Sequence, residues 1–226
     1  MEKERNEQTA NIGSAKKPKM QFDKTKTYTI EESLKILGEH KKNFSQSYDL
    51  VFTLKNINLK MPENKISREI VLPHGTGNEI KVGLISNDGD IKEADIKKLE
   101  GNPKVIKKII KQYDFFISDT SLMTMVGKVM GRYLAPTGRM PKPIPPKADP
   151  KNIIAMLQKS IRIRIKDSPT IHCIIGKEMM TENQIKENIE TVLKEVKAAL
   201  PKGSEQVKSV YLKKTMSSPV KLAVKW

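Results

Sequence analysis

Apolar and polar residues alternate along residues 48–54, where Tyr48, Leu50, Phe52 and Leu54 take every second position. A period of two predicts a β-strand with one buried face. Shorter apolar runs bounded by turn residues predict further strands at residues 68–72, 80–84, 113–117, 162–166, 172–176, 207–214 and 220–224.

Apolar residues spaced by three or four positions predict the helices. The clearest stripe lies in residues 185–200, and Pro201 and Gly203 end it. Two capping boxes, at residues 29–32 (TIEE) and 181–184 (TENQ), mark helix starts, because a threonine accepts a backbone N–H and a Glu or Gln three residues later reaches back. The helices are predicted at residues 30–37, 96–99, 105–110, 122–133, 152–159 and 182–200.

Residues 134–147 hold five prolines and no acidic residue. Because proline lacks an N–H and fixes φ, the preceding helix is predicted to end near Tyr133 and to lead into a stiff, extended, cationic loop. Such a loop suits a phosphate backbone. A solvated surface loop without a partner is the alternative that composition leaves open.

Strands alternate with helices between residues 80 and 159, which predicts a small, mainly parallel α/β layer. With 37% hydrophobic residues the chain can build a core. Residues 1–21 hold few apolar groups and are predicted to form a disordered, basic tail.

The charge balance points to a polyanionic partner. The 226 residues include 42 Lys and Arg against 26 Asp and Glu, a formal net charge of +16. Nucleic acid is favoured over an anionic membrane, and a basic protein without such a partner is the alternative. Cys173 is the only cysteine, which excludes an intrachain disulfide and fits a reducing compartment such as the cytoplasm. No membrane span, secretory signal or metal-ligand spacing is recognisable.

No residue pattern predicts an enzyme. Residues 75–77 (GTG) lack the Gly-Lys-Ser/Thr ending of a phosphate-binding loop, so a turn or hinge is the preferred interpretation. No dinucleotide fingerprint follows a predicted strand, and no nucleophile elbow is present. We therefore expect no catalytic residue, cofactor or metal, and an enzyme using a nucleotide remains a minority alternative.

Two segments combine cations, hydroxyls and an apolar side chain. They are residues 41–47 (KKNFSQS), before the first predicted strand, and residues 213–218 (KKTMSS), between the last two. Structured RNA is bound through its phosphates, its 2′-hydroxyls and stacking on its bases, so this combination favours RNA. A core role for Phe44 is the alternative.

Several segments together resemble one family, in its motif order. Residues 43–50 (NFSQSYDL) look like its "NFTQSVEL", residues 72–77 (LPHGTG) like its hinge motif, residues 128–142 like its "GRxLGPRGxMPxP" and residues 209–216 (SVYLKKTM) like its "SVYVKTTMGP". The chain is similar, over about residues 26–224, to the universal large-subunit ribosomal protein one family of the mobile lateral stalk, in its archaeal type. Ser217 stands where the family has glycine, and Thr137 where it has arginine.

The resemblance implies an α/β fold of two domains, of the α+β kind. Domain one, residues 22–73 plus 155–226, would be a discontinuous split α/β domain that binds RNA. Domain two, residues 74–154, would be an inserted, Rossmann-like three-layer α/β domain. The hinge between them would be formed by Pro73, His74, Gly75, Thr76 and Gly77.

The resemblance also implies a non-enzymatic structural constituent of the large ribosomal subunit in the cytoplasm. Its partners would be the stalk helices of large-subunit rRNA, the exit-site tRNA whose release it assists, and its own-operon mRNA, which it would repress. A generic basic RNA-binding or interaction protein outside the ribosome is the alternative. RNA contacts carried over by motif fall on Phe44, Ser47, Asp49, Arg164, His172, Ser209, Thr215, Met216 and Ser217. Three lysines are added as phosphate partners by charge: Lys42, Lys177 and Lys213.

Overall fold

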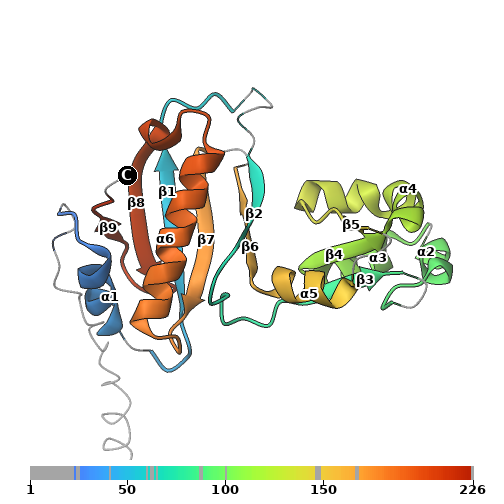
Figure 1. The fold of residues 1–226 in the computed structure, drawn as a ribbon, viewed down its shortest axis with the longest axis horizontal. Helices are drawn as coiled ribbons and strands as arrows, with labels where there is room; N and C mark the ends of the chain where they lie inside the picture. The colour runs from blue at the N-terminus through green and yellow to red at the C-terminus, as the bar shows by residue number, and fades with distance from the viewer. Residues whose placement is uncertain are drawn as a thin grey trace, which may run out of the picture.

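A computed structural model describes residues 23, 26–40, 42–59, 61, 64, 66–86, 89–99, 101–145, 149–165 and 168–224. The tail predicted at residues 1–21 lies outside the described residues. The described chain forms two domains joined by two crossings of the backbone (Figure 1). No helix among these residues is long and apolar enough to cross a membrane.

The described residues form six α-helices, one 3-10 turn and nine strands. The helices are α1 (Ile30–Gly38), α2 (Glu93–Leu99), α3 (Pro103–Gln112), α4 (Thr120–Thr137), α5 (Pro150–Gln158) and α6 (Glu182–Ala199), with a 3-10 turn at Gly203–Gln206. The strands are β1 (Ser47–Leu54), β2 (Ser67–Val71), β3 (Val82–Ile85), β4 (Phe115–Asp119), β5 (Lys142–Ile144), β6 (Ser160–Arg164), β7 (Thr170–Lys177), β8 (Val207–Lys214) and β9 (Val220–Leu222).

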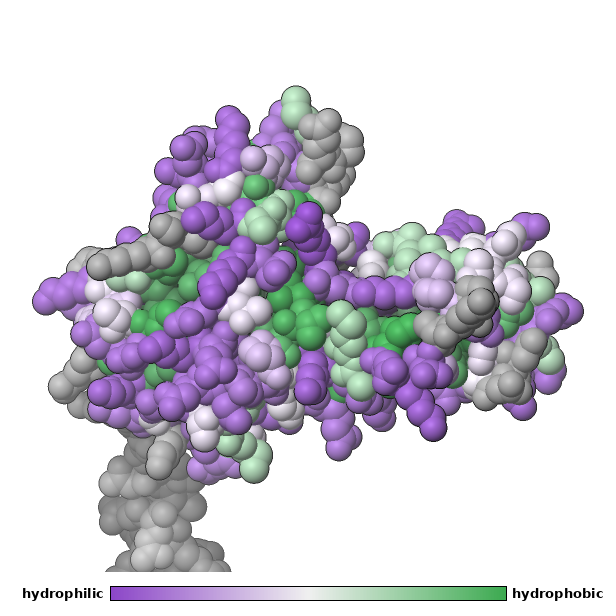
Figure 2. Space-filling model, viewed as in Figure 1, coloured by the Kyte–Doolittle hydropathy of each residue, from purple (hydrophilic) through white to green (hydrophobic). Residues whose placement is uncertain are grey.

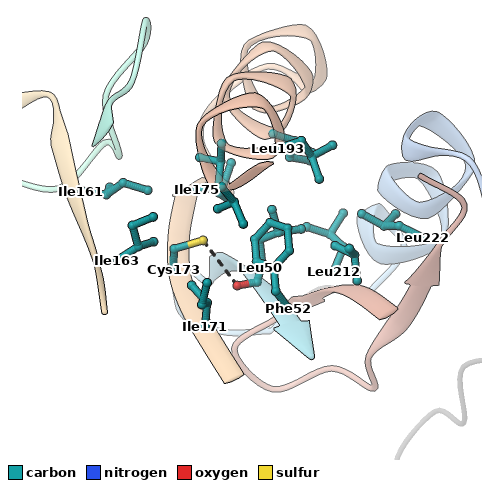
Figure 3. Packing of buried hydrophobic residues seen from close by; sticks show 14 of the residues in the cluster. Leu50, Phe52, Ile161, Ile163, Ile171, Cys173, Ile175, Leu193, Leu212 and Leu222 are labelled. Atoms are coloured by element: carbon teal, nitrogen blue, oxygen red, sulfur yellow. Dashed lines mark hydrogen bonds between the residues drawn. The ribbon is translucent and has the colours of Figure 1, made fainter. Parts of the chain in front are cut away.

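Domain one is built on a four-stranded antiparallel sheet in the order β7-β1-β8-β9. Along β1 every second side chain is buried, as the alternation predicts. Helices α1 and α6 cover one face of this sheet, and their apolar sides pack on Leu50, Phe52 and Leu212 (Figures 1 and 3). The thiol of Cys173 lies in this core and donates to the Leu50 carbonyl at 3.5 Å. None of the described helices of domain one covers the opposite face of the sheet, and it is called the open face below.

A second antiparallel pair, β2 and β6, leads from domain one to domain two. Ile161 and Ile163 follow the alternation of β6, and together with Ile165, just after the strand, they join the core of domain one. Figure 2 shows the helix-covered side of the molecule as mostly hydrophilic, with apolar patches between α1 and α6 and near β6 and α5.

Domain two has three layers, as expected. Its sheet is parallel in the order β3-β4-β5. Helices α2, α3 and α4 pack on one side of it, around Ile96, Ile106 and Val126, and α5 packs on the other through Leu157. The boundary predicted between residues 154 and 155 falls inside α5.

The proline-rich segment differs from the prediction in two ways. Helix α4 runs through Pro136 to Thr137 instead of ending near Tyr133. Its last turn survives the missing N–H because Gly138, at a φ of 72°, caps it by donating to Ala135, while the Thr137 hydroxyl donates to Leu134 at 2.7 Å. Further on, residues 142–144 form the edge strand β5, where a proline needs no ladder partner on its solvent side.

Candidate RNA-binding surface

The open face of the domain-one sheet presents polar and charged side chains in register. Asp49 on β1 lies opposite Lys213 on β8, and Thr53 lies opposite Ser209. On the other side of β1, His172 of β7 is paired with Val51. These side chains point away from the core because the neighbouring positions are the buried ones.

At one end of this sheet, the loop before β1 meets the turn after β8. We call this place the corner, formed by residues 42–47 and 214–217. The Thr215 hydroxyl accepts the Ser47 N–H at 3.1 Å and lies 3.3 Å from the Ser47 carbonyl, which also accepts the Thr215 N–H. Phe44 and Met216 project from the corner with 49% and 63% of their surfaces exposed. Bases stack on exposed aromatic side chains and pack on apolar ones, so the corner offers a platform for stacking.

A buried ion pair supports the corner from below. Lys214 is 1% exposed, and its Nζ donates to Glu178 Oε1 at 2.9 Å. Glu178 Oε2 accepts the Gln46 N–H at 3.3 Å, and the Glu178 N–H donates back to the Gln46 carbonyl. The bond from Lys214 lowers the pKa of Glu178, and burial raises the pKa of Tyr48, whose ring lies 5.2 Å from the ammonium, to about 12.

Sequence reasoning missed this pair. One signal was present, because Lys214 occupies an inward position in the alternation of β8, where an apolar residue is expected. Only the fold brings Glu178 from the end of β7 to that lysine.

Ser217, which replaces the family's glycine, closes the turn that follows β8. Its hydroxyl accepts the Lys214 N–H at 2.8 Å and lies 3.2 Å from the Lys214 carbonyl. Among described residues other than glycine only Asn56 has a positive φ, so serine fits at 217 without backbone strain.

The remaining predicted residues lie toward domain two. Asp49, His172 and Lys213 line a cleft of about 560 Å³ between the open face and domain two. Burial raises the pKa of Asp49, and the nearby charges of Lys213 and His172 partly offset that effect. Arg164 points elsewhere: its Nη1 donates to the carbonyl of Pro136, in domain two, at 2.8 Å.

The predicted contacts therefore fall into groups. Seven belong to the corner or its edge: Lys42, Phe44, Ser47, Lys177, Thr215, Met216 and Ser217. Three line the cleft, and Ser209 lies further along β8 on the same open face. Arg164 is engaged between the domains.

Two further contacts join the domains, and an ion pair within domain one links them. Glu69 on β2 is paired with Lys142 on β5 and, at 3.3 Å, with Arg162 on β6. The Arg162 guanidinium lies 4.6 Å from the ring centroid of Phe115 on β4. An ion pair and a cation–π contact thus hold domain two over part of the open face.

The segment predicted as a hinge leaves β2 and rests on α6. Gly75 and Gly77 have φ values of 65° and 69°, which glycine adopts without strain. Asn188, fully buried on α6, donates to the carbonyls of Gly75 and Ile175, both at 2.9 Å, and accepts the His74 N–H at 3.3 Å. The start of the crossing is therefore fastened to domain one.

Comparisons with known proteins agree with the motifs. The model of the Ribosomal protein L1p/L10e family matches residues 35–218. A protein named large ribosomal subunit protein uL1 from Pyrococcus abyssi is 37% identical over 217 residues, which cover 90% of this chain and 98% of that protein. Its namesake from Methanosphaera stadtmanae is 40% identical over 204 residues, 84% and 96% of the two chains. The one from Methanocaldococcus jannaschii is 39% identical over 193 residues, 80% and 88% of the two chains. With its fold, its motifs and these relatives in agreement, the chain belongs to the ribosomal protein L1p/L10e family.

Proposed function

We propose that this protein is a structural constituent of the large ribosomal subunit that binds the stalk region of its rRNA through domain one. The observation that carries the proposal is the corner, where exposed Phe44 and Met216 stand beside Lys42 and the hydroxyl groups of the Ser47–Thr215 contact. Aromatic and apolar surface, hydroxyls and cations are the groups that read a folded RNA by shape, stacking and backbone.

The preformed contacts of the corner support this role. Thr215 and Ser47 hold each other through three short backbone and hydroxyl contacts, and the Lys214–Glu178 pair fixes both loops beneath them. Because these loops are already ordered, RNA binding pays little further ordering entropy, which favours affinity.

The test compares the large-subunit stalk RNA with an unrelated duplex of the same length, across a salt series. Any basic protein binds RNA at low salt, so the informative quantity is the ratio of dissociation constants near physiological salt. We expect a preference of about a hundredfold or more for the stalk RNA. Equal binding that weakens equally with salt would instead identify a generic basic RNA-binding protein and would remove the predicted site residues from the proposal.

We also propose that the two domains move about the crossings at residues 73–77 and 158–160. A cleft of about 560 Å³ suits a small molecule, and an RNA helix cannot enter it. Asp49, His172 and Lys213 would therefore reach RNA only after domain two has swung away, which also frees Arg164 from Pro136. Two backbone crossings with glycines at one of them suit such a hinge.

Replacing Lys142 with Gln is expected to open the molecule. The substitution removes the ion pair that links β5 to Glu69, worth about 1 kcal/mol or less at a partly exposed site, and so raises the open population by up to about fivefold. Small-angle X-ray scattering should give a larger radius of gyration, and stalk RNA should bind somewhat more tightly. Lys92→Gln, exposed just before α2, is the control. An unchanged radius and affinity would argue against the closing role of this pair.

Two finer roles complete the proposal and rest on the resemblance. Domain two would assist the release of deacylated tRNA from the exit site, and the protein would repress its own mRNA through an operator that imitates the rRNA site. A shared site predicts that unlabelled stalk RNA displaces the operator RNA completely. Simultaneous binding of both RNAs would exclude repression through the corner.

A further inference from the structure

Helix α3 of domain two exposes four lysines on one side, Lys104, Lys107, Lys108 and Lys111. At 3.6 residues per turn these side chains fall within an arc of about 100°. The opposite side of the helix is buried in the core of domain two. The helix holds no acidic residue, and none of the four lysines forms an ion pair with another described residue.

This arrangement opposes the stability of the helix. The four lysines are neighbours at spacings of three and four, so each pair repels, and Lys104 lies in the first turn beside the positive end of the helix dipole. Lysines on two other helices differ. On α2, Lys97 and Lys98 are paired with acids of the same helix, and on α6, Lys186 is paired with Glu31 of α1.

The neighbouring helix α4 also carries exposed positive charge. It adds Lys128 and Arg132, both exposed, and carries no Asp or Glu. Helices α3 and α4 pack together in one layer of domain two (Figure 1). A surface with this composition is typical of the electrostatic contact with a nucleic-acid backbone.

The C-terminal end of α3 lies at the cleft between the domains. Arg139 Nη1 donates to the carbonyls of Ile110 and, at 2.8 Å, Tyr113, and so fastens the end of α3. Arg139 also lines the cleft, together with Asp114 and Phe115, which lie two and three residues after the helix. The C-terminal end of α3, whose last turn carries Lys111, therefore lies near the surface through which domain one is proposed to bind RNA.

We infer that the lysine side of α3, with Lys128 and Arg132 of α4, is a second RNA-binding surface that contacts the phosphate backbone of a helix independently of sequence. The inference rests on the proposed function for its class of ligand. RNA phosphates supply the negative charge that the helix lacks. Domain one provides the specificity for the RNA, and domain two binds its phosphate backbone through electrostatic contacts.

The experiment compares two quadruple variants of the full chain. One is Lys104→Gln, Lys107→Gln, Lys108→Gln and Lys111→Gln. The matched control replaces four exposed lysines of domain one with Gln, at Lys194, Lys197, Lys202 and Lys208. Each variant lowers the net charge of +16 by four. Binding of the stalk RNA and of an unrelated duplex RNA is measured from low to physiological salt.

A plot of log affinity against log salt has a negative slope. The α3 variant is expected to make this slope shallower by about three for both RNAs, and the control by less than one. Equal changes in the two variants, or an unchanged slope in the α3 variant, would overturn the inference. If the wild-type protein showed no preference for the stalk RNA, the proposed function alone would be contradicted. The salt dependence of duplex binding would still test the role of α3. If the quadruple variant folds poorly, the single variant Lys108→Gln provides the test, and it should make the slope shallower by about one.

Discussion

Replacing Glu178 with Ala is expected to lower the free energy of unfolding by about 3 kcal/mol, the low end for breaking a buried ion pair. The substitution leaves the Lys214 ammonium, 1% exposed, without its carboxylate, and it removes the acceptor of the Gln46 N–H. Chemical denaturation measures the loss. The same variant should bind stalk RNA more weakly, because both loops of the corner lose their support.

The partner substitution tests the physical cause. Lys214→Met should cost less than Glu178→Ala, because Glu178 remains 26% exposed and water can hydrate it, whereas methionine fills the buried space. Combining Lys214→Met with Glu178→Gln should restore most of the stability. Glu195→Ala, exposed on α6, is the control and should change stability by less than about 0.5 kcal/mol. A double variant as unstable as Glu178→Ala would contradict the role of the charge pair.

The pair also predicts a direction for acid sensitivity. The hydrogen bond that Lys214 donates holds the pKa of Glu178 below its ordinary value. The carboxylate therefore contributes stability at pH values above its unfolded pKa, near 4.3, and this contribution is lost as the pH falls through the lower folded value. In Glu178→Gln that part of the acid dependence should be absent.

Replacing Asn188 with Ala is expected to destabilise the protein by about 3 kcal/mol. The change leaves two buried carbonyls and one N–H without their partner, and each such group costs about 1–3 kcal/mol unless water reaches it. Because these groups belong to His74, Gly75 and Ile175, the crossing between the domains should also become more mobile. Thermal melting measures the first effect, and hydrogen exchange at residues 74–77 measures the second.

Asn183→Ala provides a matched control, since it makes the same change on an exposed position of the same helix. It should alter stability by less than about 0.5 kcal/mol. Destabilisation of Asn188→Ala without faster exchange at residues 74–77 would show that Asn188 supports the core of domain one and not the crossing.

Local patterns were sufficient for the elements whose faces are decided by burial. The alternation of Tyr48, Leu50 and Phe52 corresponds to β1, and the capping box at Thr29 starts α1, with the Glu32 carboxylate 2.9 Å from the Thr29 N–H. Local patterns did not predict the end of α4, which was expected before Pro136. The helix ends instead where Gly138, two residues after Pro136, adopts the left-handed conformation and caps it.

The site was less accessible to sequence reasoning than the fold. Short motifs placed Phe44 and Thr215 in loops, and the fold brings these loops together. Motifs could not predict that Arg164 faces Pro136, because that contact depends on how the domains pack. Nor could they predict the pairing of Lys214 with Glu178, since a lysine at an inward strand position is explained only by a carboxylate from another element.

The distance along the chain between the two halves of the corner has a consequence for protein synthesis. Ser47 and Thr215 are separated by 168 residues, whereas the three strands of domain two follow one another without interruption by domain one. At roughly 5–20 residues per second, a ribosome needs on the order of ten seconds to translate from one to the other. Domain two can fold during that time, while β1 waits for β7 and β8. A prematurely ended chain that lacks β8 therefore has no corner, and under the proposed function it could not bind the stalk RNA.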